Sequence, residues 1–236
     1  MATAIHPVLD FPPSPRDHAP AIGTPAHLLA ALRASTRPAE TLHGFVMLSG
    51  HSAVYRLGLC AAVDRALAGE PVLYVAGANV FDPFVVSRLA KAARIAPARL
   101  LQQIHVSRAF TCHQMVRLVA DCLPEALRRY DARVVVLSGP LETLYDQSVP
   151  DQEALRLFRT LSTALQDLSQ KDIQVLCVSP LPVMASDPRR KFLPALHAQA
   201  QRVIDVREEH EGIRLETGSG DKTTSWTIPR TVWTRI

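Results

Sequence analysis

The octet 50–57 occupies the place of a phosphate-binding loop, because it follows a short apolar run and precedes a helical pattern. A working loop has a second glycine that lets backbone amides surround the phosphates, a Lys for the β- and γ-phosphates, and a hydroxyl for Mg²⁺. The octet keeps its first glycine, Gly50, but the other three positions hold Tyr55, Arg56 and Leu57. A single glycine after a strand is also typical of an ordinary strand-to-helix turn.

Five later segments give this octet its context, and they follow it in the order 72–81, 104–114, 133–138, 175–180 and 194–203. The segment 104–114 is the most specific, because Arg108-Ala109-Phe110 follows an expected strand and His113-Gln114 opens an expected helix. In their joint order and spacing, these segments resemble RecA/RadA-type recombinases from about Gly44 to Glu216.

The resemblance implies a RecA-like P-loop ATPase core in which the nucleotide site is degenerate. The family's catalytic Glu falls on Ala78, its Walker B Asp on Ser138, and the Gln that senses the γ-phosphate on Pro180. Without a catalytic carboxylate and metal-ordering groups, phosphoryl transfer loses its charge stabilisation. The resemblance therefore implies a pseudo-ATPase without a cofactor, although Arg56 could still meet a phosphate as a point charge. The degenerate nucleotide site comprises Gly50, Tyr55, Arg56, Leu57, Ala78, Ser138 and Pro180.

Active recombinases grip single-stranded DNA with two loops, and the matching loops here differ in charge. The first, 145–151, is acidic, which argues against contact with a phosphate backbone. The second, 180–194, contains Arg189-Arg190-Lys191 followed by Phe192, a basic and aromatic cluster that could contact phosphates and stack on a base. The alternative is a solvated loop with Phe192 in the core.

Metal chemistry is not expected. The four cysteines are widely spaced and form no C-x-x-C pair, which disfavours both a zinc site and a disulfide framework. The histidines show no ligand spacing, and His105, His113 and His197 are interpreted as core or capping residues that form hydrogen bonds.

The elements that would position these residues alternate between short apolar runs and longer amphipathic stretches, which predicts an α/β fold of RecA type. Its sheet would be mostly parallel and twisted, with helices on both faces. A final antiparallel hairpin is expected within 212–236. Strands are expected at 44–49, 71–76, 103–106, 133–138, 173–179 and 203–207, and helices at 55–68, 83–93, 112–129 and 152–170.

The first 23 residues are predicted to form a flexible, proline-rich arm ahead of one core domain, 24–236. A short helix is expected from Thr24, which is followed by proline. Within the arm, Val8, Leu9 and Phe11 are candidate partner-binding residues that could add a strand to a neighbouring protomer. A disordered tail is the alternative.

Composition predicts a cytoplasmic protein without a membrane span or a secretion signal. Its net charge of +4 is compatible with a polyanionic partner. The leading functional expectation is an accessory or regulatory subunit in DNA recombination or repair, which assembles with itself or with an active recombinase. Single-stranded DNA is a further candidate partner. The alternatives are a scaffold subunit of an unrelated complex and a nucleotide sensor without hydrolysis.

Overall fold

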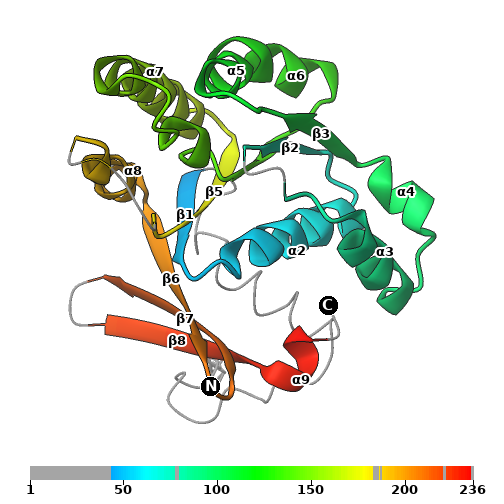
Figure 1. Cartoon of the computed structure of the whole chain (residues 1–236). Coiled ribbons are helices and arrows are strands. Elements are labelled where there is room, and N and C mark those ends of the chain that lie inside the picture. The colour runs from blue at the N-terminus through cyan, green and yellow to red at the C-terminus, as the bar shows by residue number, and fades with distance from the viewer. Residues whose placement is uncertain (1–43, 78–79, 183–185, 187, 220–221, 235–236) are drawn as a thin grey trace, which may run out of the picture.

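The structure, a computed structural model, describes residues 44–77, 80–182, 186, 188–219 and 222–234. This part of the chain is built around one eight-stranded sheet with the strand order β3-β2-β4-β5-β1-β6-β7-β8 (Figure 1). The strands are β1 (Gly44–Gly50), β2 (Val72–Ala76), β3 (Ile104–Arg108), β4 (Val134–Ser138), β5 (Gln174–Pro180), β6 (Arg202–Glu209), β7 (Gly212–Ser219) and β8 (Lys222–Pro229).

Strands β1 to β6 pair in parallel, and β7 and β8 continue the sheet in antiparallel fashion. All seven residues of β1 are buried, as expected for a central parallel strand that is covered on both faces. The predicted α/β fold, with a mostly parallel sheet and a C-terminal antiparallel hairpin, is therefore confirmed.

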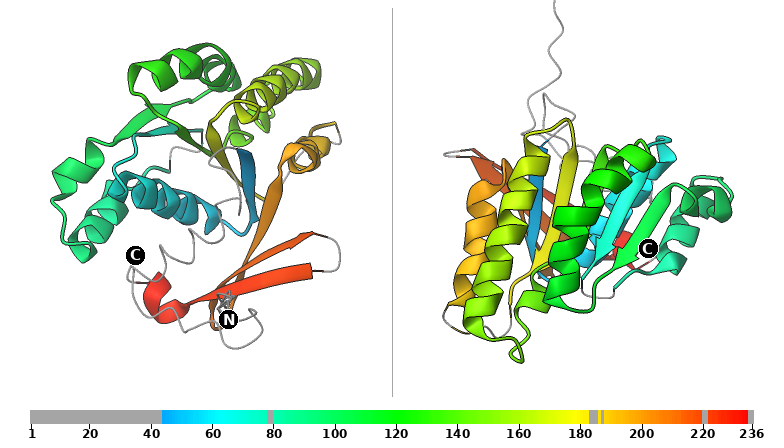
Figure 2. Two further views of the ribbon diagram at one scale, coloured as in Figure 1. Left: turned by 180° about the vertical axis from the view of Figure 1, so that it is seen from behind. Right: turned by 90° about the horizontal axis from the view of Figure 1, so that it is seen from above.

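Helices cover both faces of the sheet (Figure 2). Alternate residues of β1 point to opposite faces, so that Val46 and Leu48 join one core and Phe45 and Met47 join the other. The first core also contains α2 (Val54–Leu67), α3 (Pro83–Ala92), α4 (Pro97–Leu101) and α9 (Arg230–Trp233). The second contains α5 (Cys112–Arg117), the π-helical turn η1 (Leu118–Cys122), α6 (Leu123–Arg129), the 3₁₀ turn η2 (Glu142–Leu144), α7 (Asp151–Ser169) and α8 (Phe192–Gln199); a second 3₁₀ turn, η3 (Arg189–Lys191), precedes α8.

Two local expectations need correction. The helix expected over 112–129 is interrupted by η1, where the Leu123 amide bonds to the Leu118 carbonyl five residues back. Pro124 explains the change, because it has no N–H and its ring would clash with the carbonyl four residues earlier. The end of the expected hairpin is also wrong, since residues 230–233 form α9 and place Val232 in the core.

The arm (1–23), its residues Val8, Leu9 and Phe11, and the helix expected from Thr24 lie outside the described residues, as does the boundary between arm and core. Within the described ranges, no helix combines the length and the apolar character needed to cross a membrane.

Candidate functional site

The carboxyl ends of the central strands bring several of the predicted site residues together. Gly50, the last residue of β1, lies beside Pro180 at the end of β5. Ser138 ends β4 on the other side of β5, where it pairs with Val178. Ligands of parallel α/β sheets bind at this edge, because the loops that follow the strands converge there. Ala78 lies outside the described residues.

The turn after β1 uses its backbone amides within the protein. Gly50 has a φ of +124°, and a Cβ atom at this position would lie 2.2 Å from the Val206 carbonyl oxygen. The His51 amide donates to that same oxygen at 2.7 Å. The Val54 and Tyr55 amides donate to the carbonyls of His51 and Ser52, at 3.1 and 3.2 Å. These three amides are therefore committed to the turn, whereas a phosphate cradle needs amides that point at the ligand.

Tyr55 connects helix α2 to the turn that follows β4. Its hydroxyl donates a hydrogen bond to Oε1 of Glu142 in η2. Burial raises the pKa of the Glu142 carboxyl, and the Tyr55 hydroxyl partly offsets this by stabilising the charged form. Burial, together with the neighbouring Glu142 charge, also raises the pKa of Tyr55. The side chain at the second glycine position is thus used to hold two segments of the fold together.

Arg56 and Leu57, which the resemblance places at the positions of the phosphate-binding Lys and the metal-binding hydroxyl, also contact their own chain. The Arg56 guanidinium lies 4.9 Å from the centre of the Trp233 ring and donates to the Trp233 carbonyl at 3.2 Å. Leu57 lies on the buried side of α2 and is completely enclosed in the core. A cleft of about 290 Å³ adjoins this contact and is lined in part by His51, Tyr55, Arg56, Asp82 and Trp233.

The ends of β2 and β4 approach each other closely. The Gly77 amide donates to the Ser138 carbonyl at 2.7 Å. A Cβ atom on Gly77 would lie 2.3 Å from the Gly139 carbonyl oxygen, so a side chain at this position would require the backbone to move. The Ser138 side chain is fully buried. At this position a carboxylate would carry a charge into a site without solvent, which costs several kcal/mol unless it is paired.

The predicted DNA-binding cluster is divided between the interior and the surface. Arg189 is 3% exposed, and its guanidinium bonds to the Asp151 carboxylate and to the carbonyls of Leu144, Asp146 and Val149. Arg189 therefore fastens the acidic loop 145–151 to the loop 180–194.

Phe192 is 1% exposed and stacks on Phe158 with 4.3 Å between ring centres. Arg190 and Lys191 are exposed, and they are the two residues of the predicted cluster that nucleic acid could reach in this arrangement.

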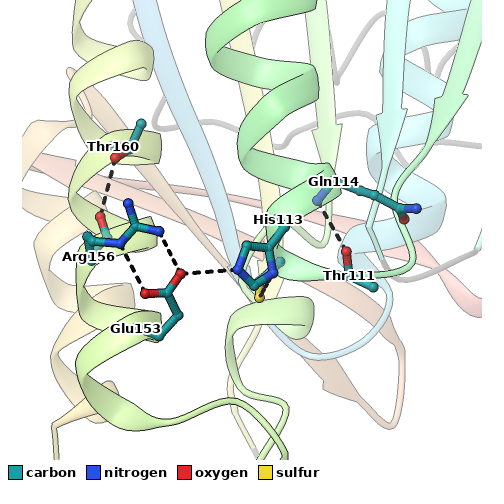
Figure 3. Close-up of polar contacts among 7 residues, drawn as sticks. Thr111, His113, Gln114, Glu153, Arg156 and Thr160 are labelled. Atoms are coloured by element: carbon teal, nitrogen blue, oxygen red, sulfur yellow. Dashed lines mark hydrogen bonds and ion pairs between the residues drawn. The ribbon is translucent and has the colours of Figure 1, made fainter.

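A polar chain between α5 and α7 was missed by sequence reasoning (Figure 3). Nε2 of His113 lies 3.1 Å from Oε1 of Glu153, and Arg156 donates two hydrogen bonds to the same carboxylate. These bonds, mainly those from Arg156, lower the pKa of Glu153 to about 2. The 40-residue separation of His113 and Glu153 explains why no local pattern revealed the contact. Thr111 is the N-cap of α5 and accepts a hydrogen bond from the Gln114 amide.

Cys112 extends this chain, since its sulfur lies 3.6 Å from Nδ1 of His113. The order thiol, imidazole, carboxylate is that of a nucleophile, a base and an orienting group. However, Cys112 is 1% exposed, and burial raises the pKa of its thiol, both of which oppose a reactive thiolate. We interpret the chain as a structural link between α5 and α7.

The other two histidines singled out in the sequence are partly buried, and the buried Nε2 of His197 has no hydrogen-bond partner among the described residues, unlike the expectation for this residue. His105 stacks on Tyr130 with 3.7 Å between ring centres, and His197 is partly buried in α8. Within the described ranges, no group of three or more His, Cys, Asp or Glu side chains could hold a metal ion.

Comparison of the sequence with models of known protein families and with curated proteins found no match.

Proposed function

We propose that this protein is a non-catalytic RecA-type accessory subunit in DNA recombination or repair, which assembles with itself or with an active recombinase. The RecA type of the fold, the loss of ATPase activity and the pathway are all parts of the proposal. They start from the resemblance between residues 44 and 216, with its substituted functional positions.

The observation that carries the proposal is how the side chains at the nucleotide positions are used. Tyr55 bonds to Glu142, Arg56 stacks on Trp233, and Leu57 is buried. Phosphate binding would require Tyr55 and Arg56 to leave these contacts, and the buried Glu142 carboxylate would lose its hydrogen-bond donor. Losing such a donor costs about 1–3 kcal/mol, which opposes nucleotide entry.

The chemistry of hydrolysis gives further support. Transfer of a γ-phosphoryl group needs Mg²⁺ held by a hydroxyl and a carboxylate, and a group that orients the attacking water. The corresponding positions hold Leu57, Ser138 and Ala78. None of these side chains is ionisable, so none supplies the charge that the transition state needs.

Assembly with a recombinase is tested by mixing the purified full chain with the RecA-type recombinase of its own host. The molar mass of the mixture is measured by light scattering after size separation. Co-elution at a defined mass ratio supports the proposal, whereas two independent peaks, with and without single-stranded DNA, would remove the recombinase as a partner. A scaffold in an unrelated complex would also give two peaks and would bind no DNA.

Thermal unfolding in the presence of Mg²⁺ and ATP distinguishes the nucleotide-sensor alternative from the proposed accessory subunit. A ligand at 100 times its dissociation constant stabilises the folded state by about 2.7 kcal/mol, which is readily measured. We expect no shift of the unfolding midpoint. A saturable shift that is lost in Arg56→Ala would favour a sensor that uses the cleft beside Trp233.

A further inference from the structure

One segment of the chain, residues 80–108, carries a net positive charge as large as that of the whole protein. Residues 80–108 contain the five cations Arg88, Lys91, Arg94, Arg99 and Arg108, and a single carboxylate, Asp82. The whole chain has 26 basic and 22 acidic side chains, so the rest of the chain has 21 of each. The formal net charge of +4 therefore equals that of this segment, and the remainder is balanced.

The segment forms one flank of the molecule, made of α3, α4 and the edge strand β3 (Figure 1). On α3, Phe84, Arg88 and Lys91 have the spacing i, i+4 and i+7, which places them on one stripe of the helix. The opposite side of α3 is buried in the core, so this stripe faces outward. All five cations of the segment are exposed.

The segment's single carboxylate does little to neutralise the surface. Asp82 is the N-cap of α3, where its side chain accepts hydrogen bonds from the amides of Phe84 and Val85. Its other oxygen lies 4.0 Å from Arg88, at the limit of an ion pair. An exposed pair of this length contributes little to stability, and with the charge of Asp82 counted the segment still has a formal net charge of +4.

Two phenylalanines are exposed beside these cations. Phe84 is 72% exposed and Phe110 is 67% exposed, the two highest values among the large apolar residues that the structure leaves in solvent. The backbone of each is held in place, because the Phe84 amide donates to Asp82 and the Phe110 amide donates to Gln114, both at 2.8 Å. They follow neighbouring strands, since Ala76 at the end of β2 pairs with Arg108 at the end of β3. The rings are thus presented to solvent at one edge of the basic flank.

We propose that this flank, defined by Arg88, Lys91, Arg94, Arg99, Arg108, Phe84 and Phe110, is a binding surface for single-stranded nucleic acid. Cations along a surface contact successive phosphates, and exposed aromatic rings stack on bases. Single strands fit better than duplexes, because their bases are free to stack on Phe84 and Phe110. The surface is separate from the Arg190–Lys191 loop, which belongs to the opposite layer with α8.

This inference deepens the proposed function and rests on it for its choice of ligand, but the two can fail separately. Absence of DNA binding by the wild-type chain would overturn the surface, while co-elution with a recombinase would stand as an independent result. Conversely, if the protein binds single strands through this flank but assembles with no recombinase, the binding surface is supported and the proposed partner is rejected.

The test is the fluorescence anisotropy of a labelled thymidine oligonucleotide of about 16 bases, titrated with the full chain at several salt concentrations. The variant Lys91→Ala/Arg94→Ala/Arg99→Ala is expected to weaken binding by on the order of tenfold or more. It should also reduce the salt dependence of log K by about 2, because each lost phosphate contact on a single strand removes about 0.7. The variant Phe84→Ala/Phe110→Ala should weaken binding by about tenfold or more with an unchanged salt slope.

A matched control removes three exposed cations from the other face, in Arg117→Ala/Arg128→Ala/Arg159→Ala. It loses the same charge and should keep most of the affinity. Circular dichroism melting of each variant verifies its fold. Three results overturn the inference: no salt-dependent binding by the wild type, equal losses in both triple variants, or poly-glutamate competing as well as the oligonucleotide. The last result would identify a surface for an acidic protein instead.

Discussion

The Tyr55 hydroxyl donates a hydrogen bond to the Glu142 carboxylate across 87 residues of sequence, and so joins the first turn of α2 to the turn after β4. Tyr55 is one of the positions at which the proposed function places a degenerate nucleotide site. The proposed loss of nucleotide binding therefore has two causes, namely the packing of Tyr55 against Glu142 and the absence of the catalytic groups.

The Tyr55–Glu142 bond predicts a pH-dependent cost for Tyr55→Phe. The folded-state pKa of Glu142 is raised above its ordinary value of 4.5, so its protonated form is favoured in the folded state. The stability this gives is fully present below pH 4.5 and is lost as the pH rises through the folded pKa. The Tyr55 hydroxyl stabilises the charged form of Glu142 and so reduces the stability lost as the pH rises. Tyr55→Phe should therefore lower the free energy of unfolding by about 1–3 kcal/mol at neutral pH and by less near pH 4. Urea unfolding at both pH values measures the difference.

Tyr130→Phe is the matched control for that variant, because Tyr130 is at the surface and its ring stack on His105 would be kept. It should unfold like the wild type at both pH values. Equal stability of Tyr55→Phe and Tyr130→Phe would show that the Tyr55–Glu142 bond contributes nothing.

Arg189→Ala should be among the most destabilising single changes on the surface loops. It removes a buried guanidinium and leaves the carbonyls of Leu144, Asp146 and Val149 without that donor. We expect a loss of about 2–4 kcal/mol in the free energy of unfolding, measured by urea denaturation. Lys191→Ala, two residues away and exposed, should change it by less than about 0.5 kcal/mol. Similar midpoints for the two variants would contradict the role assigned to Arg189.

The Glu153 carboxylate should titrate far below its ordinary pKa. Arg156 and His113 hold its pKa at about 2, against an ordinary value of 4.5. A depressed pKa contributes stability that is present above pH 4.5 and is lost as the pH falls through the folded value. The advantage of the wild type over Glu153→Gln should therefore disappear between pH 4.5 and about 2. Unfolding midpoints of the two proteins measured across this pH window test the prediction. A constant difference between wild type and Glu153→Gln down to pH 2 would count against a stabilising contact of Glu153 with Arg156 and His113.

Arg190 and Lys191 make a second, smaller candidate for DNA contact. If the loop binds single strands, Arg190→Ala/Lys191→Ala should lower the salt slope by about 1.4 at most, since two phosphate contacts are lost. We expect a smaller loss of affinity than in the α3–α4 triple variant. A larger effect of the loop variant, in the same anisotropy titration, would move the binding surface to the loop.

The arm predicted from the sequence is tested by deleting residues 1–20. Burying Val8, Leu9 and Phe11 on a neighbour could contribute on the order of 1.5–3 kcal/mol each before ordering costs. The deletion should therefore lower the molar mass of any assembly seen by light scattering. An assembly of unchanged mass would leave the arm without a part in the contact.

The fold could largely be predicted because buried parallel strands are marked by short apolar runs, such as Val134–Ser138, whose bounds differ from the expected ones by one residue. The sheet then brings Gly50, Ser138 and Pro180 to one edge without further information. The π-helical turn was missed although Pro124 signals a disturbance, because the proline alone does not say whether a helix ends, kinks or bulges.

The side-chain contacts of the site could not be predicted. Tyr55 with Glu142, Arg56 with Trp233 and Arg189 with Val149 join residues that are 87, 177 and 40 positions apart. Each depends on where two separate elements come to lie in the fold. The same limit explains why Arg189 was predicted to face DNA. An arginine in a basic run resembles its neighbours in sequence, and burial alone distinguishes it from Lys191.

The absence of ATP turnover is the central claim, and phosphate release from Mg²⁺-ATP by the purified full chain tests it most directly. Leu57, Ser138 and Ala78 supply neither the metal-ordering groups nor the carboxylate that the reaction needs, so the rate should equal that of a blank without protein. An active recombinase assayed in parallel establishes the sensitivity. Mg²⁺-dependent release that follows the protein through purification, and that is abolished by Arg56→Ala, would contradict the account.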